Sequence, residues 1–151
     1  TEPIYDGERI QLRDIIEEDS ELDESFFIDE ADTEKWEYLK GAKKEKRTTK
    51  NGFVYNYSEG GMIYPDQLDK PSRTIITGEG GRSPSRFKHV IKTDRGLRRL
   101  TPIELERLNM FPDDHTKLDG ITDAKRAFFM GNALVVGVIE KIGISIIKKL
   151  K

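Results

Sequence analysis

Residues 98–113 read RRLTPIELERLNMFPD, and this stretch decides how the C-terminal third is built. Its centre has the layout of a helix start: Thr101 stands at the N-cap, Pro102 takes the first helical position, and Glu104 follows three residues after the cap. The pattern predicts a capping box and a helix that runs to about Asn109. The Phe-Pro pair that follows should end the helix, because a residue before proline disfavours helical backbone.

A second helical region follows, in which residues 126–133 read RAFFMGNA, beginning 13 residues after Asp113. One or two helical turns are predicted over 123–129, and Gly131-Asn132 should break the chain before a final helix that starts at about Ala133. One face of that helix is apolar at the 3.6-residue period of an α-helix, and it comprises Val135, Val138, Ile139, Ile142, Ile146 and Leu150.

The first 52 residues show turns rather than long elements. A short strand leading into a turn or helix start is predicted over 10–16. The acidic stretch 14–34 and the aromatics after it predict short helical turns that bury a few rings. Residues 41–51 read as a polar basic loop, with Asn51-Gly52 as a turn signal.

The middle of the chain shows short strands. Period-two alternation predicts a strand over 53–57, with 62–64 pairing back across a turn at 58–61. Further strands are predicted over 73–77 and 87–91, separated by a flexible loop at 78–84 and followed by a turn at 94–96. We therefore expect an α+β fold with a small, twisted, mainly antiparallel sheet, irregular loops and a C-terminal helical segment.

The composition excludes several classes of functional site in this chain. The chain has 151 residues, enough for one domain or a domain with a projecting element. It contains no cysteine, which excludes a disulfide framework, a Cys-based zinc site and a thiolate nucleophile within it. With only two histidines, no metal site is expected. The polar start Thr1–Pro3 shows no signal pattern, and 133–150 is too short and too charged to span a bilayer, so a cytoplasmic protein is expected.

Together, 98–113 and 126–133 resemble the ninth and tenth motifs of bacterial DNA (cytosine-5)-methyltransferases, in the right order and spacing. Upstream, residues 71–77 (PSRTIIT) resemble the Thr-Ile or Thr-Leu element near the end of that family's target-recognition domain. The resemblance covers about residues 50–147. It implies a target-recognition small domain over 1–112, and a linker with a tenth-motif helix over 113–151.

The resemblance also implies what the chain lacks. The family's N-terminal catalytic domain carries a cofactor loop, a Pro-Cys nucleophile, a Glu-Asn-Val element and a Gln-x-Arg-x-Arg element, and none occurs here. In the family, the Cys thiolate attacks carbon-6 of a flipped-out cytosine, and carbon-5 then takes methyl from S-adenosyl-L-methionine. We therefore expect no catalytic residue and no activity in this chain alone. Its expected role is duplex DNA recognition for restriction-modification or an orphan methyltransferase.

Charge segregation supports a DNA-binding role. Residues 14–34 hold 11 acidic residues and no basic one, whereas 37–99 hold 15 Lys or Arg against 7 Asp or Glu. Two recognition loops are predicted, and their residues are Tyr57, Ser58, Glu59, Gly60, Gly61 and Met62 in the first, and Thr74, Ile75, Thr77, Gly78, Gly80, Gly81, Arg82, Ser83 and Arg86 in the second. Arg82 and Arg86 are the candidates for guanine or phosphate contacts. The basic residues expected to meet phosphates or nothing are Lys43, Lys44, Lys46, Arg47 and Lys50.

The remaining roles follow from the resemblance. Gly131, Asn132 and Ala133 match the position that lines the cofactor pocket from the C-terminal side, although one wall should not bind S-adenosyl-L-methionine alone. A structural role, holding the recognition loops, falls to Arg98, Thr101, Pro102 and Glu104. The final helix should pack on the catalytic domain, and without it should promote self-association.

Two alternatives stay open. The chain is either a fragment or the second subunit of a split methyltransferase, and a start at Thr1 without Met favours the fragment. A stand-alone DNA-binding or protein-interaction module is the rival, but such a module has no reason to keep Gly131-Asn132 and the apolar helix after it.

Overall fold

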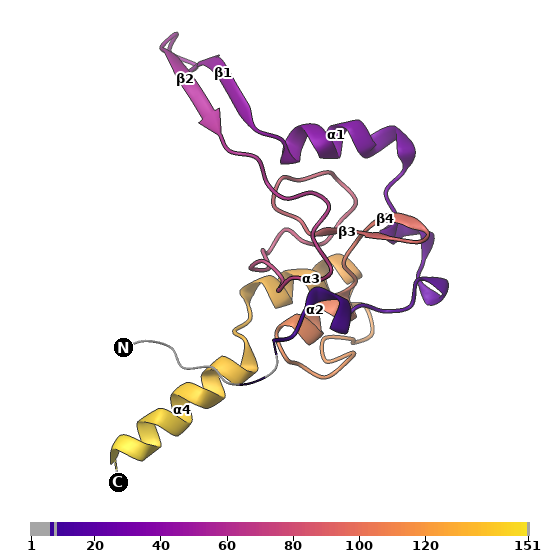
Figure 1. The fold of residues 1–151 in the computed structure, drawn as a ribbon, viewed down its shortest axis with the longest axis vertical. Helices are drawn as coiled ribbons and strands as arrows, with labels where there is room; N and C mark the ends of the chain where they lie inside the picture. The colour runs from indigo at the N-terminus through magenta and orange to yellow at the C-terminus, as the bar shows by residue number, and fades with distance from the viewer. Residues whose placement is uncertain (1–6, 8, 151) are drawn as a thin grey trace.

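The computed structural model describes residues 7 and 9–150, and it shows a central body from which two arms project (Figure 1). One arm is a β-hairpin and the other is the C-terminal helix. The arms leave opposite ends of the body toward the same side, so the molecule has the outline of a letter C. The polar start Thr1–Pro3 lies outside the described residues.

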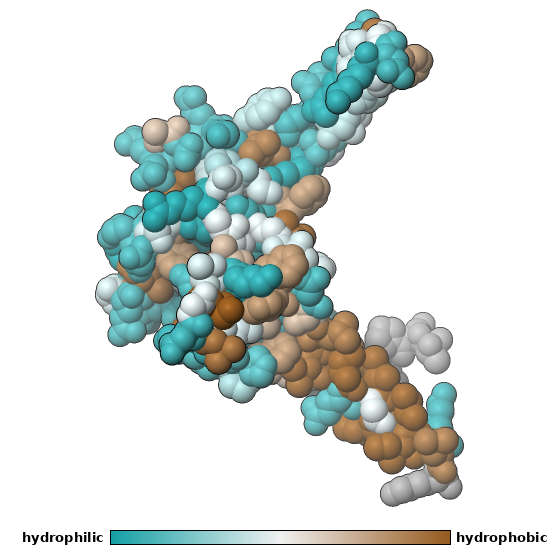
Figure 2. Space-filling model, turned by 180° about the vertical axis from the view of Figure 1, so that it is seen from behind, coloured by the Kyte–Doolittle hydropathy of each residue, from teal (hydrophilic) through white to brown (hydrophobic). Residues whose placement is uncertain are grey.

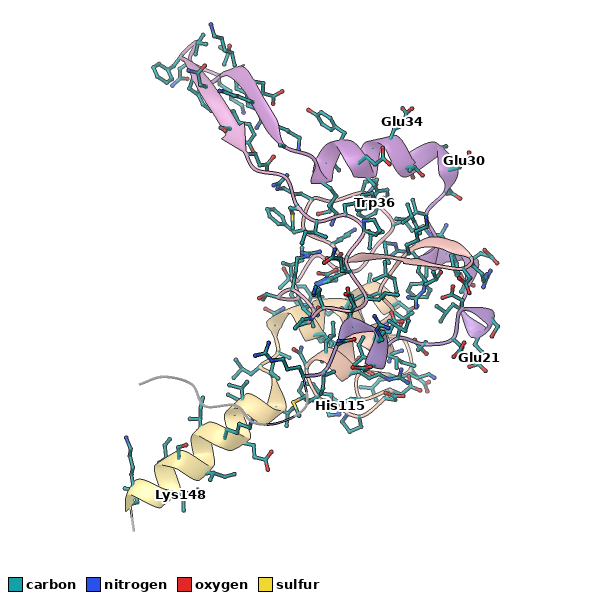
Figure 3. The ribbon with its side chains drawn as sticks, viewed as in Figure 1. Glu21, Glu30, Glu34, Trp36, His115 and Lys148 are labelled. Atoms are coloured by element: carbon teal, nitrogen blue, oxygen red, sulfur yellow. The ribbon has the colours of Figure 1, made fainter. Side chains whose placement is uncertain are left out.

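The N-terminal part contains three 3₁₀ turns, at Leu12–Asp14, Asp19–Glu21 and Glu24–Phe26, followed by helix α1 (Glu30–Lys40). The predicted helical turns are therefore present. The turn or helix start predicted within 10–16 is present as the 3₁₀ turn Leu12–Asp14, whose amides bond to the 68–70 loop, but the strand predicted before it is wrong. Trp36 of α1 points into the body and is 1% exposed, whereas Glu30 and Glu34 point away from it (Figure 3).

The first arm pairs β1 (Lys43–Thr48) with β2 (Val54–Glu59) in antiparallel register, Lys43 opposite Glu59 and Thr48 opposite Val54. The turn at Asn51-Gly52 is confirmed, since the Gly52 amide donates to the carbonyl of Thr49 at 3.0 Å. The loop predicted over 41–51 is wrong for β1, whose sequence KKEKRT has no alternation to reveal a strand. Residues 62–64 do not pair back across 58–61, because β2 takes β1 as its partner.

A second antiparallel pair joins β3 (Val90–Thr93) to β4 (Gly96–Arg99) and leads directly into helix α2 (Pro102–Leu108). The predicted turn at 94–96 is present, and the predicted strand at 87–91 starts at residue 90 instead. The strand predicted over 73–77 is wrong, since residues 73–76 belong to no strand and Thr77 lies in a turn. The α+β class is confirmed, with two separate two-stranded ribbons in place of one sheet.

The hydrophobic core is small and lies where α2, β3 and the first 3₁₀ turn meet helix α3 (Asp123–Asn132). Its buried members are Leu12, Ile15, Ile91, Leu100, Leu105, Ala127 and Met130. The predicted capping box is present at the start of α2: the Thr101 hydroxyl accepts from the Glu104 amide at 3.1 Å, and the Glu104 carboxylate accepts from the Thr101 amide at 2.8 Å. Helix α3 continues through Gly131-Asn132, so the predicted break falls later, at residues 133–135.

Helix α4 (Val136–Leu150) forms the second arm, and its surface is strongly apolar (Figure 2). Ile142 and Ile146 are 51% and 54% exposed, and Val138 is 53% exposed. By length and composition alone, the stretch Asp123–Leu150 is apolar enough to cross a membrane. The backbone at Ala133 is extended, however, and the 15-residue α4 measures about 22 Å, less than the roughly 30 Å of a bilayer's hydrocarbon core.

Candidate nucleic-acid interface

Residues 60–89 contain no helix or strand, and buried polar side chains hold this segment in place. The Asp66 carboxylate accepts hydrogen bonds from Arg73 Nε at 2.6 Å, Arg73 Nη2 at 3.0 Å and the Val90 amide at 2.9 Å. Burial opposes the negative charge, but the bonds from Arg73 and Val90 outweigh it, and the net effect lowers the pKa of Asp66. Asp66 therefore stays ionised and ties the segment to β3.

Glu79 and His89 form a second buried contact in the same segment. One Glu79 oxygen lies 2.8 Å from His89 Nδ1, and the other accepts from the His89 amide at 2.9 Å. His89 Nε2 lies 3.1 Å from the Ser72 hydroxyl. Glu79, the acidic residue of the Gly-rich loop (residues 78–84), therefore points inward and ties this loop to His89.

Two buried cations, Lys88 and Arg99, donate hydrogen bonds to backbone carbonyls of the Gly-rich loop. Lys88 Nζ donates to the carbonyls of Gly81 at 3.0 Å and Ser83 at 2.7 Å, and Arg99 also donates to Gly81 at 2.9 Å. Lys40 donates to the carbonyl of Lys88. Burial, followed by the nearby charge of Arg73, lowers the pKa of Lys40 to about 8. Carbonyls bound in this way fix the loop's shape.

The same loop rests on α3 through two close glycine contacts. A Cβ added to Gly80 would lie 2.6 Å from the Ala124 Cα, and one added to Gly131 would lie 2.4 Å from the Thr77 Cα. Any larger residue at either position must push the loop and the helix apart. Gly131 thus has a packing role that is independent of any cofactor.

The predicted second recognition loop, 74–86, presents its outer edge to solvent. Its exposed members are Thr74, Thr77, Gly78, Gly81, Arg82 and Ser83, while Ile75 and Gly80 are half-buried. Arg82 is an exposed cation beside the buried Arg99, whose pKa is lowered by burial and by the charge of Arg82. A carboxylate already lies near this pair, since hydrogen bonds from Ser25 and the charge of Arg82 lower the pKa of Asp23.

Arg86 stands in a different environment from Arg82. Its guanidinium donates to the carbonyls of Leu39 at 3.1 Å, Gly41 at 3.2 Å and Gly60, and it pairs with Glu59 at 2.8 Å. Its side chain is only 14% exposed. The structure therefore places Arg86 at the base of the hairpin arm, where it joins the hairpin to the end of α1.

The predicted first recognition loop, 57–62, divides between two environments. Tyr57, Ser58 and Glu59 belong to strand β2, and Gly60, Gly61 and Met62 lead back to the body. The Met62 amide donates to the carbonyl of Lys40 at 2.9 Å, which fixes the end of the segment. The two predicted loops therefore meet at Arg86, between the hairpin and the Gly-rich loop.

Arg98 forms the centre of the group predicted to be structural. It is 0% exposed, and its two terminal nitrogens donate to both carboxylate oxygens of Glu104 at 3.0 and 2.8 Å, while Nε donates to Asp19 at 2.8 Å. Burial opposes the charge of Arg98, but Glu104 and Asp19 outweigh it, and the net effect raises its pKa. This pair connects β4, the cap of α2 at Thr101-Pro102, and the acidic N-terminal stretch.

The residues predicted to face a cofactor lie at the end of α3. Gly131 and Ala133 line a cavity of about 460 Å³, together with Thr74, Asn109 and Val135. The Asn132 side chain is exposed, and its amide donates to the carbonyl of Phe128 at 2.8 Å. The cavity lies between residues 72–75 and the start of the second arm.

Comparison with known proteins adds the family. Residues 3–148 match the family model described as C-5 cytosine-specific DNA methylase. The chain belongs to the C-5 cytosine-specific DNA methylase family. It is 46% identical over 143 residues to type II methyltransferase M.Sau3AI of Staphylococcus aureus. That alignment covers 95% of this chain but 33% of M.Sau3AI, so the chain spans about a third of the length of the relative it matches.

Sequence reasoning missed the buried polar residues that shape this C-5 cytosine methylase chain. Asp66, Glu79, Lys88 and Lys40 were not singled out, because charged residues are ordinarily solvated and their spacing carries no period. The contact of Glu106 with Arg126 was missed too, although Arg126 opens the second quoted motif; their side chains pair at 3.0 Å and join α2 to α3. One weak sign of a buried polar contact is present in the sequence: Glu79 is the single acidic residue within a run of glycines.

Proposed function

We propose that this chain is the C-terminal part of a DNA (cytosine-5)-methyltransferase, comprising its target-recognition region and its ninth and tenth motifs. It recognises a sequence in double-stranded DNA, and a segment outside the 151 residues supplies the chemistry. Family membership and the two quoted motifs support this assignment. The chain's lack of cysteine supports it as well, because the family's reaction needs a thiolate.

The observation that carries the proposal concerns the loop 74–86: buried side chains hold its backbone on one side, and its other side is exposed to solvent. Buried Lys88 and Arg99 hold its carbonyls, while Gly81, Arg82 and Ser83 stay exposed. A major groove is read by side chains that reach base edges from a backbone held close to the DNA. Small residues permit that approach, and an arginine can form two hydrogen bonds with guanine.

The different environments of the two arginines support different roles for them. We propose that Arg82 contacts guanine or phosphate, because its side chain is exposed and next to a second cation. Arg86 would instead position the first loop, residues 57–62, because Glu59 and three carbonyls already occupy its guanidinium. Residues of the first loop would contact DNA beside the second.

In the complete enzyme S-adenosyl-L-methionine would supply the methyl group. Gly131, Asn132 and Ala133 would form one wall of its site. The cavity beside Gly131 and Ala133 supports that placement, since it offers both apolar and polar lining. Thr77 already fills the space next to the Gly131 Cα, so contact would come from the backbone of residues 132–133. These residues form only one side of the site, so we expect no measurable binding of S-adenosyl-L-methionine by this chain.

We propose two parts, 1–112 for recognition and 113–151 for attachment to the catalytic domain. The contacts of α3 refine this division: Arg126 pairs with buried Glu106, and Gly131 touches Thr77, so α3 packs on the body. The apolar helix α4 alone projects, and it would pack on the catalytic domain.

Duplex binding by the 151-residue chain tests this proposal. Duplexes enriched from a randomised pool should bind with an affinity that falls as salt rises, and labelled S-adenosyl-L-methionine should transfer no methyl to them. Arg82→Ala should weaken binding to the enriched duplex by about 5- to 100-fold and leave unselected duplex little changed. Arg13→Ala is the control, since Arg13 is an exposed arginine in the first 3₁₀ turn. Methyl transfer by the chain, or no duplex binding, would contradict the proposal.

A further inference from the structure

The β1–β2 hairpin divides its side chains between two faces. Successive residues of a strand point to opposite faces, and residues paired across the ribbon share one. The register therefore defines a paired face, comprising Lys43, Glu45, Arg47, Tyr55, Tyr57 and Glu59, and an open face, comprising Lys44, Lys46, Thr48, Val54, Asn56 and Ser58. The two faces differ sharply in charge balance.

The paired face is neutralised by its own contacts. Lys43 pairs with Glu59 at 3.2 Å, and Arg47 pairs with Glu45 at 2.6 Å. The Arg47 guanidinium also lies 3.5 Å from the centre of the Tyr57 ring. Both acidic residues of the hairpin strands are therefore paired with basic residues on this face, and its charges balance.

The open face keeps its cations and hydrogen-bonding groups free. Lys44 and Lys46 are exposed, and neither has an ionic partner among the described residues. They stand two residues apart on one side of a strand, so their charges repel. Opposite them in the register, Ser58 faces Lys44 and Asn56 faces Lys46, and the side chains of both are exposed. An anion along this face would relieve the repulsion between the lysines.

The shape of the arm suits a groove. Arg86 clamps the base of the hairpin to the end of α1, and beyond it the arm stands clear of the body (Figures 1 and 2). Six paired residues extend about 20 Å, and the major groove of DNA, about 12 Å wide, admits a two-stranded ribbon. The ribbon adds no residue to the hydrophobic core, so the fold gives no reason for its length.

We infer that the open face of the β1–β2 hairpin is a second DNA-reading surface that enters the major groove. Lys44 and Lys46 bind phosphates, and Asn56 donates to and accepts from a base edge, with Ser58 beside it. The inference rests on the proposed function and extends it to strand β1 and the first half of strand β2; of the open face, only Ser58 already belongs to a predicted recognition loop. A protein partner fits less well, because protein interfaces favour aromatic residues and the tyrosines of the hairpin lie on the other face.

The test uses the 151-residue chain, a duplex enriched from a randomised pool, and an unselected duplex of equal length. Lys44→Ala with Lys46→Ala should weaken binding to both duplexes and make the slope of log affinity against log salt shallower by about 1.8, as expected for two lost phosphate contacts. The matched control replaces Lys92 and Lys117, two exposed lysines on the body, and should change the slope little.

Asn56→Ala should lower affinity for the enriched duplex by about 10- to 100-fold and leave the unselected duplex unchanged. Circular dichroism should show every variant folded, since these side chains are exposed. If the unaltered chain binds duplex but the double lysine variant keeps the full salt slope, the hairpin inference is wrong and the proposed function stands. If Asn56→Ala keeps the sequence preference, its base contact is wrong. If the unaltered chain binds no duplex, both proposals fail.

Discussion

Arg98 and Glu104 form an ion pair that water does not reach, and each carries a charge that the other neutralises. Removing one partner leaves a buried charge without compensation. Arg98→Met should therefore lower the free energy of unfolding by about 3–5 kcal/mol, measured by urea denaturation. Lys117→Met, at an exposed pair with Asp114, should cost under about 1 kcal/mol. Equal losses in the two variants would show that burial does not set the strength of this pair.

Lys40 should make stability depend on alkaline pH. Its pKa is about 8 in the folded chain against an ordinary 10.5, so it is charged in both states below pH 8 and the cost of burying the charge is constant. Between these values only the unfolded chain keeps the proton, and the free energy of unfolding should therefore rise with pH. Lys88, whose pKa burial also lowers, acts in the same direction.

Lys40 should raise the free energy of unfolding by up to about 2 kcal/mol between pH 8 and 9.5. Urea denaturation at both pH values measures it, with Lys40→Met as the comparison. The variant should show a smaller rise than the unaltered chain. An identical rise in both would mean that Lys40 does not carry a lowered pKa.

At this scale the sequence predicted residues whose roles are local. Thr101 and Glu104 form their capping box because both partners lie within four positions of the chain. Lys40, Glu79 and His89 were beyond prediction, because their contacts join segments 10 to 48 positions apart. The placements of Arg82 and Arg86 could not be separated from sequence either, since the difference depends on which carbonyls surround each.

The contact between α3 and the loop 74–86 depends on Gly131 having no side chain. In Gly131→Ala the new Cβ would meet backbone at Thr77, which cannot move without the loop. We expect a loss of about 1–3 kcal/mol in the free energy of unfolding and faster proteolysis within 74–86. Gly143→Ala is the control: it lies in helix α4 with no atom within 4 Å of an added Cβ, and alanine favours helix there. A stable Gly131→Ala variant with a protected loop would contradict this packing role.

Elements were predictable where local pattern decides them. Helices α2 and α4 follow from a cap and from a 3.6-residue apolar period, and the turn of the hairpin follows from Asn51-Gly52. Strand β1 was not, because KKEKRT is stabilised by its partner strand and by the Lys43–Glu59 ion pair between them. Ile75 and Ile76 predict a strand over 73–77, but side chains hold this segment instead: Arg73 pairs with Asp66, and the Ile76 amide donates to Glu79.

At the scale of the whole molecule, we expect helix α4 to determine whether copies of the chain associate with one another. Its exposed apolar residues form a continuous surface along the second arm (Figure 2). We expect the chain to self-associate as its concentration rises, measured by sedimentation velocity. Ile142→Lys with Ile146→Lys should give a monomer and leave the circular dichroism of the body unchanged, since neither residue touches the core. A chain that stays monomeric at high concentration would contradict this expectation.

The most direct test of the recognition role replaces the matching third of M.Sau3AI with this chain and maps the methylated cytosines. A second chimera carries residues 57–62 and 74–86 from another C-5 cytosine methylase. The first chimera should methylate duplex DNA at a defined sequence, although this chain alone transfers no methyl. The second should methylate a different sequence or lose its preference. If the methylated sequence is the same in both chimeras, the two loops do not determine recognition and the central claim is wrong.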